Sequence, residues 1–288
     1  MKLNPSCIPC LVQKQQKRVA HEDTEKQLHY LKDVLGAIAN SQEQASAPYL
    51  TSTINRVYQN YFGKQDDYAE LKQQYNAYLL ERMEQIQNKI NHAADPLLAG
   101  IQYARAGNYI DFGAMNQVNT EDLDHLLETA LEQTIDQKTY QQFFEQLNSA
   151  KKLVYLTDNC GEIVLDMLLL QQLKKFNLDI TVIVRGAPIL NDATLQDAKQ
   201  CKMDQQFRIL ENGTDIAGTE LELISDEAKQ AIQQADIIIS KGQGNFESLH
   251  GCGLNIYYLF LCKCQLFVNR FHLNHLDGVF INERDVQI

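Results

Sequence analysis

Apolar residues in the first half of the chain recur every three or four positions, the spacing of one face of an α-helix. The segments with this spacing are residues 28–38, 54–62, 68–90, 97–101, 120–133 and 136–148. Gly63 follows the second segment as a helix stop, and Pro96 stands at the start of the fourth. None of these segments alternates polar and apolar residues with a period of two. The pattern therefore predicts a helical cap or bundle over residues 1–150.

The pattern changes at Lys151. Short apolar runs then predict strands, and these cover residues 152–157, 179–184, 206–210, 236–240, 256–262 and 278–282. Residues 163–173 and 225–235 have helical spacing and lie between some of these runs. The run over residues 256–262 is also compatible with a buried helix. Strands that alternate with helices indicate βαβ units and a mostly parallel sheet. We therefore expect a Rossmann-like α/β region over residues 151–288, packed against the helical region.

Charge and composition narrow the classes of partner. The chain has 288 residues, and 26 Lys and Arg against 37 Asp and Glu give a formal net charge of −11. A broad nucleic-acid surface needs net positive charge, so we expect no nucleic-acid partner. No apolar run of about 18 residues predicts a membrane span, and the N-terminal segment lacks the apolar core of a signal peptide. These features predict a cytoplasmic protein whose seven cysteines are thiols.

Polar side chains gather where the predicted strands end. They form four segments, namely residues 158–162, 185–192 and 240–247 together with Lys263. Ligands of open parallel sheets bind beyond the carboxyl ends of the strands. We therefore expect these four segments to converge on one crevice, and that convergence is stronger evidence than any one of them alone.

The side chains in these segments predict a particular chemistry. Asp158, Asn159 and Asp192 supply two carboxylates and an amide oxygen, a hard ligand set that suits Mg²⁺ or Mn²⁺. Lys241 and Lys263 would offset the charge of a phosphate bound to that metal. A metal with ammonium groups around a phosphoryl group is what phosphoryl transfer to water requires.

Each of these fragments also has an ordinary structural interpretation. Asn159 and Glu162 have the spacing of a helix capping box, and Asn191 with Asp192 could cap another helix. The glycines of the KGQGN segment (241–245) could form a simple turn, or could let backbone N–H groups approach a phosphate. The common nucleotide-binding fingerprints, GxGxxG after the first strand and the P-loop, are absent.

The pair Cys7 and Cys10 forms a Cys-x-x-Cys motif near the N-terminus. It is half of a zinc site, a redox pair, or two thiols at the start of a helix. Zinc would need two further ligands, and the candidates are Cys252, Cys262, Cys264, His21 and His250. The sequence does not choose among these three interpretations.

Several motifs of the chain, in order, resemble those of the damage-control phosphatases, also known as domain-of-unknown-function family 89. In the second half they are TDNCGEIVLD (157–166), VRGAPILNDAT (184–194), SKGQGNFESL (240–249) and CKC (262–264). In the first half they are CIPC (7–10), DDYAELKQQYN (66–76) and DPLLAGIQYARAGNYIDFGA (95–114). The Cys-x-x-Cys start is similar to the prokaryotic subfamily.

This resemblance implies a three-layer α/β/α fold with an added N-terminal helical region. It also implies hydrolysis of phosphate monoesters of small metabolites, such as sugar phosphates or damaged phosphorylated metabolites, with a divalent cation (Mn²⁺, Co²⁺, Ni²⁺ or Mg²⁺). The residues on family positions are Asp158, Asn159 and Asp192 for the metal, Lys241, Gly242 and Asn245 for the phosphate-side loop, Lys263 as a second lysine, and Asn108 and Asp111 in the same cleft.

Two features depart from the family pattern. Cys160 stands where a different small residue is usual, and the Arg-Thr-x-Lys signature of the carboxyl-methyltransferase-like branch is absent. We expect Asp158, Lys241 and Lys263 to be catalytic, and the nucleophile is either Asp158 or a water activated by the metal. The alternatives to a phosphatase are a carboxyl methyltransferase and a non-catalytic protein that binds a metal or sugar phosphate.

Overall fold

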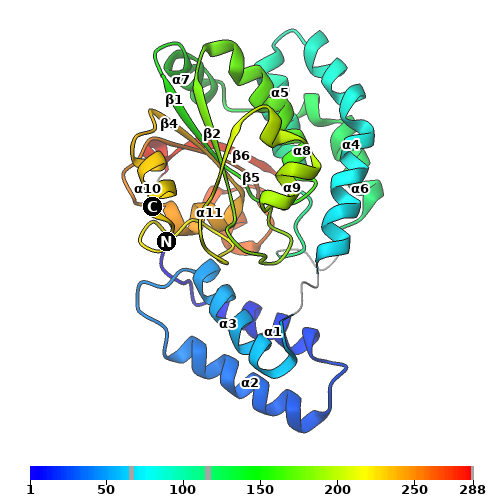
Figure 1. Cartoon of the computed structure of the whole chain (residues 1–288), viewed down its shortest axis with the longest axis vertical. Helices are drawn as coiled ribbons and strands as arrows, with labels where there is room; N and C mark the ends of the chain where they lie inside the picture. Colours follow the sequence, from blue (N-terminus) through cyan, green and yellow to red (C-terminus); the bar gives the residue numbers. More distant parts are fainter. Residues whose placement is uncertain (65–67, 114–117, 287–288) are drawn as a thin grey trace.

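The structure is a computed structural model that describes residues 1–64, 68–113 and 118–286 of the chain (Figure 1). The α-helices are α1 (Cys7–Arg18), α2 (Thr24–Ala39), α3 (Ala47–Phe62), α4 (Ala69–His92), α5 (Pro96–Gly107), α6 (Thr120–Glu128), α7 (Gln137–Leu147), α8 (Glu162–Leu173), α9 (Leu195–Gln200), α10 (Asp226–Gln233), α11 (Gly242–Leu249) and α12 (Gln265–Phe271). The strands are β1 (Lys152–Leu156), β2 (Asp179–Val184), β3 (Arg208–Glu211), β4 (Ile237–Lys241), β5 (Ile256–Leu261) and β6 (Gly278–Asn282).

Local sequence signals set the ends of several helices. Asp95 caps α5 by accepting hydrogen bonds from two backbone N–H groups, and Pro96 occupies the first turn, where no N–H is needed. Gly63 ends α3 with a φ of 83°, a conformation that favours glycine. The segment 120–133, predicted as one helix, is divided into α6 and a short 3₁₀ turn over Ala130–Glu132.

The described strands form one sheet in the order β3-β2-β1-β4-β5-β6, parallel except for β6, which pairs antiparallel with β5. The sheet confirms the predicted α/β class, and β5 settles the open choice for residues 256–262 in favour of a strand. The strand order reverses between β1 and β4, which are neighbours although they lie far apart in sequence. Open α/β sheets bind ligands at such a reversal, beyond the carboxyl ends of the strands.

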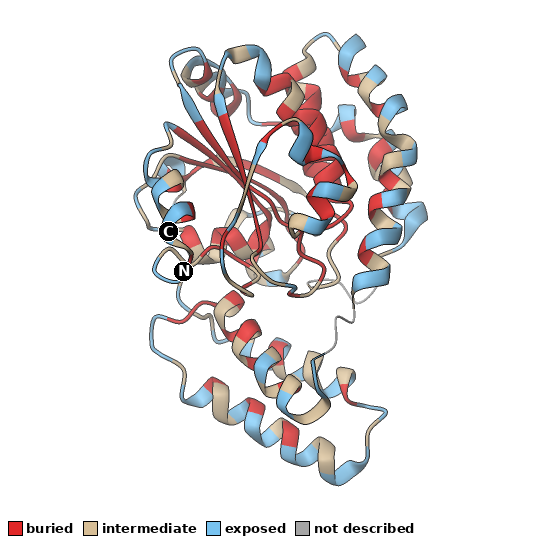
Figure 2. Ribbon diagram, in the orientation of Figure 1, coloured by how far each residue is buried: buried red, intermediate tan, exposed pale blue. Residues whose placement is uncertain are grey.

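Helices cover both faces of the sheet and complete three layers (Figure 2). One apolar cluster joins α4–α9 to one face, and a second joins α10–α12 to the other. α8 is almost wholly buried between α4, α5 and the sheet. A third cluster joins α1, α2 and α3 alone, and these helices project from one end of the sheet. The division of the chain at residue 150 stays a prediction.

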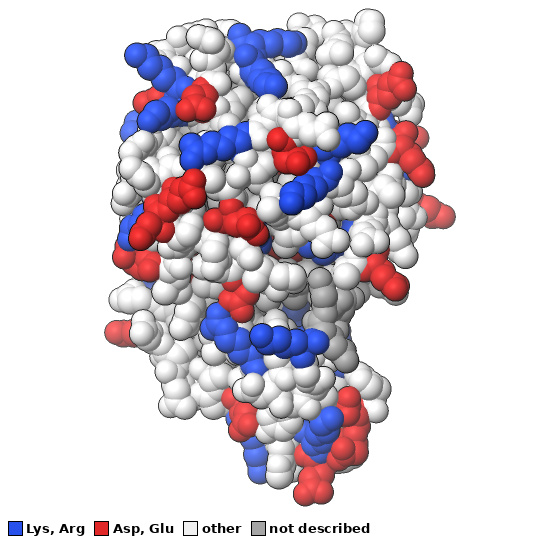
Figure 3. All heavy atoms as spheres, viewed as in Figure 1, with Lys and Arg blue, Asp and Glu red and all other residues white. Residues whose placement is uncertain are grey.

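Charged side chains of both signs are interspersed on the face drawn in Figure 3. In the described ranges, no helix is both long and apolar enough to cross a membrane.

Candidate metal centre and cavity

The loops that follow β1 and β2 are joined to each other at the edge of the sheet. The backbone N–H of Cys160 donates to the carbonyl of Asn191 at 2.8 Å, and that of Ala193 donates to the carbonyl of Asp158 at 2.7 Å. Asn159 and Asp192 face each other in an isolated antiparallel bridge. This backbone pairing brings together side chains that are more than 30 positions apart in the sequence.

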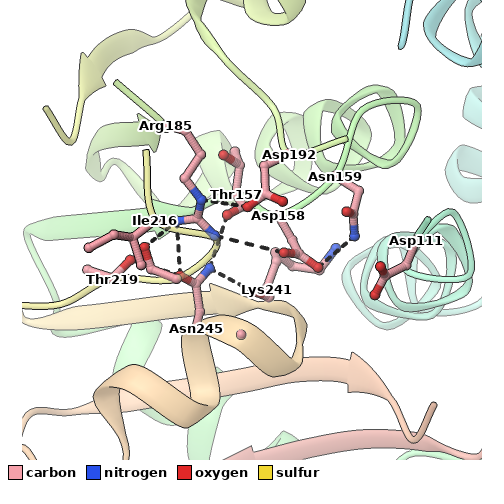
Figure 4. Close-up of polar contacts among 12 residues, drawn as sticks. Asp111, Thr157, Asp158, Asn159, Arg185, Asp192, Ile216, Thr219, Lys241 and Asn245 are labelled. Atoms are coloured by element: carbon pink, nitrogen blue, oxygen red, sulfur yellow. Dashed lines mark hydrogen bonds and ion pairs between the residues drawn. The ribbon is translucent and has the colours of Figure 1, made fainter. Parts of the chain in front are cut away.

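Asp158, Asn159 and Asp192 are almost completely buried, and all three line one cavity. Figure 4 shows their side chains beside one another. The amide N–H₂ of Asn159 donates to Asp158 Oδ2 at 2.6 Å and to Glu162, so its Oδ1 points away from these carboxylates. Within the described residues, no hydrogen bond reaches Asp158 Oδ1, Asn159 Oδ1 or Asp192 Oδ1. These three oxygens fit a hard divalent cation.

The electrostatics of the three residues also fit a cation. Burial, and then the nearby carboxylates of Asp192, Glu162 and Asp111, raise the pKa of Asp158 well above its usual value. Burial raises the pKa of Asp192 to about 6, although Arg185 opposes this shift. In the described ranges no three His, Cys, Asp or Glu side chains are grouped to hold a metal. The predicted set differs from such a group because its third ligand is an amide.

Arg185 is the main polar group of this site to which the sequence assigned no role. Its side chain is almost completely buried (2% exposed), and it directly follows the last residue of β2. Its Nε donates to Asp192 Oδ2 at 2.7 Å, and its Nη1 donates to Asn245 Oδ1 and to the carbonyl of Gly218. Its Nη2 has no hydrogen-bond partner among the residues that the structure describes, and it lies 3.9 Å from Asp158 Oδ1. The sequence signal that could have identified Arg185 is its position, because a charged residue directly after the apolar run 179–184 lies at the carboxyl end of a predicted strand.

Lys241 lies beneath the site and does not line the cavity. It is completely buried, and its Nζ donates to Glu162, to Asp166 at 2.6 Å and to the carbonyl of Ala104. Glu162 in turn accepts hydrogen bonds from Asn159 and from Asn108. The structure therefore connects Lys241 to the predicted metal ligands through one carboxylate, and its catalytic role stays a prediction.

The predicted cleft residues of the first half lie beside the same centre. Asn108 is completely buried, donates to Asp158 Oδ2 at 3.0 Å and accepts from the N–H of Leu261. Asp111 lines the cavity and accepts a hydrogen bond of 2.7 Å from Lys263 Nζ. Asp111 is therefore placed to face a ligand, Lys263 stands directly behind it, and Asn108 holds Asp158.

Gly242 leaves room for the Asp158 carboxylate, and Asn245 holds two backbone carbonyl groups beside the site. Gly242 has a φ of 79°, and a Cβ added there would lie 2.0 Å from Asp158 Oδ2. Asn245 is completely buried, and its amide donates to the carbonyls of Thr157 and Lys241. α8 begins at Glu162 with Gly161 as its N-cap, so Asn159 is not the residue directly before the helix. One half of the predicted capping box is present, because the backbone N–H of Asn159 donates to the Glu162 carboxylate at 3.3 Å.

The cavity has a volume of about 640 Å³ and lies between the carboxyl edge of the sheet and the helical region. α1 and α3 form one part of its wall, and α11 and α12 form another. All seven cysteines are thiols, as expected, and Cys7, Cys10 and Cys264 line this wall. Burial, mainly, raises the pKa of the Cys7 thiol to about 11. Cys160 is buried in the core beside the site.

Known proteins resemble this chain over nearly its whole length. The model of the damage-control phosphatase ARMT1-like domain matches residues 3–277. A protein of Methanocaldococcus jannaschii described as uncharacterized is 31% identical, over 98% of this chain and 95% of its own. Two relatives named damage-control phosphatases, from Archaeoglobus fulgidus and Pyrococcus horikoshii, are 28% and 29% identical over 92% of this chain. These matches cover 93% of the length of the Archaeoglobus fulgidus protein and 92% of that of the Pyrococcus horikoshii protein.

A solved structure has the same fold. The crystal structure of a DUF89 family protein from Pyrococcus horikoshii matches with a TM-score of 0.82 and 26% identity, covering 98% of this chain and 99% of that one.

Proposed function

Because this chain belongs to the damage-control phosphatase ARMT1-like domain family, we propose that it is a metal-dependent phosphatase of small phosphorylated metabolites. The substrates we propose are phosphate monoesters such as sugar phosphates or damaged phosphorylated metabolites. One observation supports the proposal most directly. Asp158, Asn159 and Asp192 line the same cavity, and each has one oxygen without a hydrogen-bond partner in the described structure.

These three residues would hold a divalent cation, for which Mn²⁺, Co²⁺, Ni²⁺ and Mg²⁺ are the candidates. The cation, when bound, supplies positive charge that attracts the phosphate and stabilises the transition state. The protein fixes the ligands in advance. Asn108 and Asn159 hold Asp158, and Arg185 holds Asp192. Partners of this kind orient metal ligands and commonly alter metal affinity when they are removed.

Lys263 would hold Asp111 toward the phosphate and add positive charge from behind it, because its Nζ donates to Asp111, which lines the cavity. Lys241 would contribute positive charge from beneath and hold Glu162, which orients Asn159. In the overall reaction a phosphorus–oxygen bond to water forms and the bond to the leaving alcohol breaks. The alcohol oxygen takes up a proton, and inorganic phosphate is released.

Phosphate release tests the proposal. The wild-type chain should release phosphate from a panel of sugar phosphates when Mn²⁺, Co²⁺, Ni²⁺ or Mg²⁺ is added, and EDTA should abolish the release. Asp158→Asn should lower the rate by about 100-fold or more, while the exposed control Asp204→Asn should not. Near-normal release by Asp158→Asn with Mn²⁺ would contradict the assignment. A phosphoryl group on Asp158, sought by mass spectrometry after acid quench, distinguishes attack by Asp158 from attack by water.

The helical region has a part in this proposal. We propose that, within the helical region of residues 1–150, α1–α3 act as a cap on the α/β region of residues 151–288, while α4–α7 form the layer on one face of the sheet. α1 and α3 contribute wall to the cavity, so the cap would enclose the leaving group of the substrate. The metal and phosphate would then be held by the α/β region together with Asp111.

A further inference from the structure

The cavity is larger than a phosphate group needs. The predicted metal ligands line only a part of this cavity of about 640 Å³, and most of the remaining wall comes from α1, α3, α11 and α12. Small-molecule sites combine an apolar lining with a few polar groups that fix the orientation of the ligand. Pro48, Leu190 and Leu266 contribute apolar lining of this kind. The polar groups of the remaining wall should therefore select the leaving group.

Glu247 is the carboxylate of this wall that lies outside the predicted metal centre. It projects from α11, and its side chain lines the cavity. Within the described residues, its carboxylate has no hydrogen bond and no ion pair; its backbone carbonyl alone accepts a hydrogen bond, from the Met1 amino group. Burial raises the pKa of Glu247 to about 7. Glu247 is partly buried, and a carboxylate that is removed from water without a hydrogen-bond partner destabilises a fold, so a ligand that supplies donors would satisfy it.

Lys14 is a second charged group on the cavity wall. It projects from α1, and in the described part of the chain it too has no ion pair and no side-chain hydrogen bond. The ammonium of Met1, and after it the charge of Lys14, lower the pKa of Glu247 against the effect of burial. In the described structure neither cation forms an ion pair with the Glu247 carboxylate. Away from the predicted metal centre, the wall therefore offers a ligand a carboxylate acceptor on α11 and an ammonium donor on α1.

We propose that Glu247 is a specificity-determining residue that accepts hydrogen bonds from hydroxyl or amino groups on the leaving group. Lys14 donates to acceptor atoms on the same group. This inference rests on the proposed phosphatase function. The substrate class it defines is a phosphate monoester whose alcohol portion bears further hydrogen-bond donors, that is, a polyol or an amino alcohol. Esters without such donors, for example aryl phosphates, do not use Glu247.

The test compares three phosphate esters in the presence of Mn²⁺. These are glucose 6-phosphate with hydroxyl donors, phosphoethanolamine with an amino donor, and p-nitrophenyl phosphate with neither. Glu247→Ala should lower kcat/KM for at least one of the first two esters by about 10-fold or more, chiefly through KM. It should change kcat/KM for p-nitrophenyl phosphate less than about 2-fold. The ester that loses more identifies the donor as hydroxyl or amino.

Two controls make the result specific. Glu247→Gln keeps a carbonyl acceptor and the size of the side chain. Its KM for the affected ester should therefore lie between the KM of the wild type and the raised KM of Glu247→Ala. Glu84→Gln, at an exposed position on α4, should change none of the three activities. Equal losses on all three esters, or no loss on any, would overturn the proposal, because Glu247 would then not discriminate between leaving groups.

Binding separates failure of this inference from failure of the proposed function. If the wild-type chain hydrolyses no ester with any of the four metals, the phosphatase proposal fails. The dissociation constants of glucose 6-phosphate and phosphoethanolamine, measured by calorimetry with Mn²⁺, then decide the role of Glu247. At least about 10-fold weaker binding of one of them by Glu247→Ala supports the role. Unchanged binding, or no binding by the wild type, overturns it.

Discussion

Replacing Gly242 by alanine should disturb the predicted metal centre through Asp158. Gly242 has a φ of 79°, and the added Cβ would lie 2.0 Å from Asp158 Oδ2 and 2.2 Å from its Cγ. Real contacts of this kind are never so short, so the carboxylate must move. Gly253 provides a matched control, because its φ is 80° and a Cβ there would meet nothing within 4 Å.

The magnitude follows from two separate effects. A residue with a Cβ in the left-handed region costs about 1–2 kcal/mol, and both variants share this loss of unfolding free energy. In Gly242→Ala, moving the Asp158 carboxylate also weakens its hydrogen bonds with Asn108 and Asn159. Hydrogen bonds to charged groups contribute about 1.5–3 kcal/mol each. If the displaced carboxylate loses about half of these two contributions, that is about 1.5–3 kcal/mol, Gly242→Ala should lose about 2.5–5 kcal/mol in total, and Gly253→Ala about 1–2 kcal/mol.

Urea unfolding and Mn²⁺-dependent phosphate release measure the two consequences. Gly242→Ala should lower kcat/KM by about 100-fold, since small displacements of reacting groups have effects of this size, and Gly253→Ala should leave it unchanged. If the two variants lose the same stability and both keep full activity, the contact between Gly242 and Asp158 does not position the site, and the reasoning is refuted.

Three further predictions concern the buried charges. Lys241→Met should lower the unfolding free energy in urea by about 3–5 kcal/mol, because Glu162 and Asp166 lose their buried cation; full stability with lost activity would instead indicate a purely catalytic lysine. Arg185→Met should raise the Mn²⁺ concentration needed for half-maximal activity by about 10–100-fold, because Arg185 orients one predicted metal ligand; an unchanged value would contradict this. Burial raises the pKa of Glu247 from 4.5 to about 7, so the native state holds this proton more tightly and the carboxylate destabilises the fold as pH rises through that interval. Glu247→Gln should therefore gain stability over the wild type as pH increases from 4.5 to 7, by at most about 3 kcal/mol, and a difference independent of pH in denaturant titrations would argue against it.

The pattern of apolar residues was sufficient to predict the fold class. Apolar runs such as residues 152–157 and 236–240 correspond to β1 and β4, and helical spacing over residues 163–173 corresponds to α8. The convergence of Asp158 with Asp192 also followed from sequence, because parallel strands carry their following loops to one edge of the sheet. Local spacing was less reliable where several partners competed. The Asn159–Glu162 pair has the spacing of a capping box, in which Glu162 would be the third residue of the helix. In the structure the helix begins at Glu162 itself.

Sequence by itself thus determined which strands form and which polar residues lie near the edge where they end. Only the tertiary structure decided how those polar groups pair. Lys241 is bound to Glu162 and Asp166, which are 79 and 75 positions away, and Arg185 is the cation beside Asp192. Such pairings depend on which buried charges the packed helices and sheet bring within a few ångströms of one another. Backbone periodicity carries no information on those distances, because it reports only which face of an element is apolar.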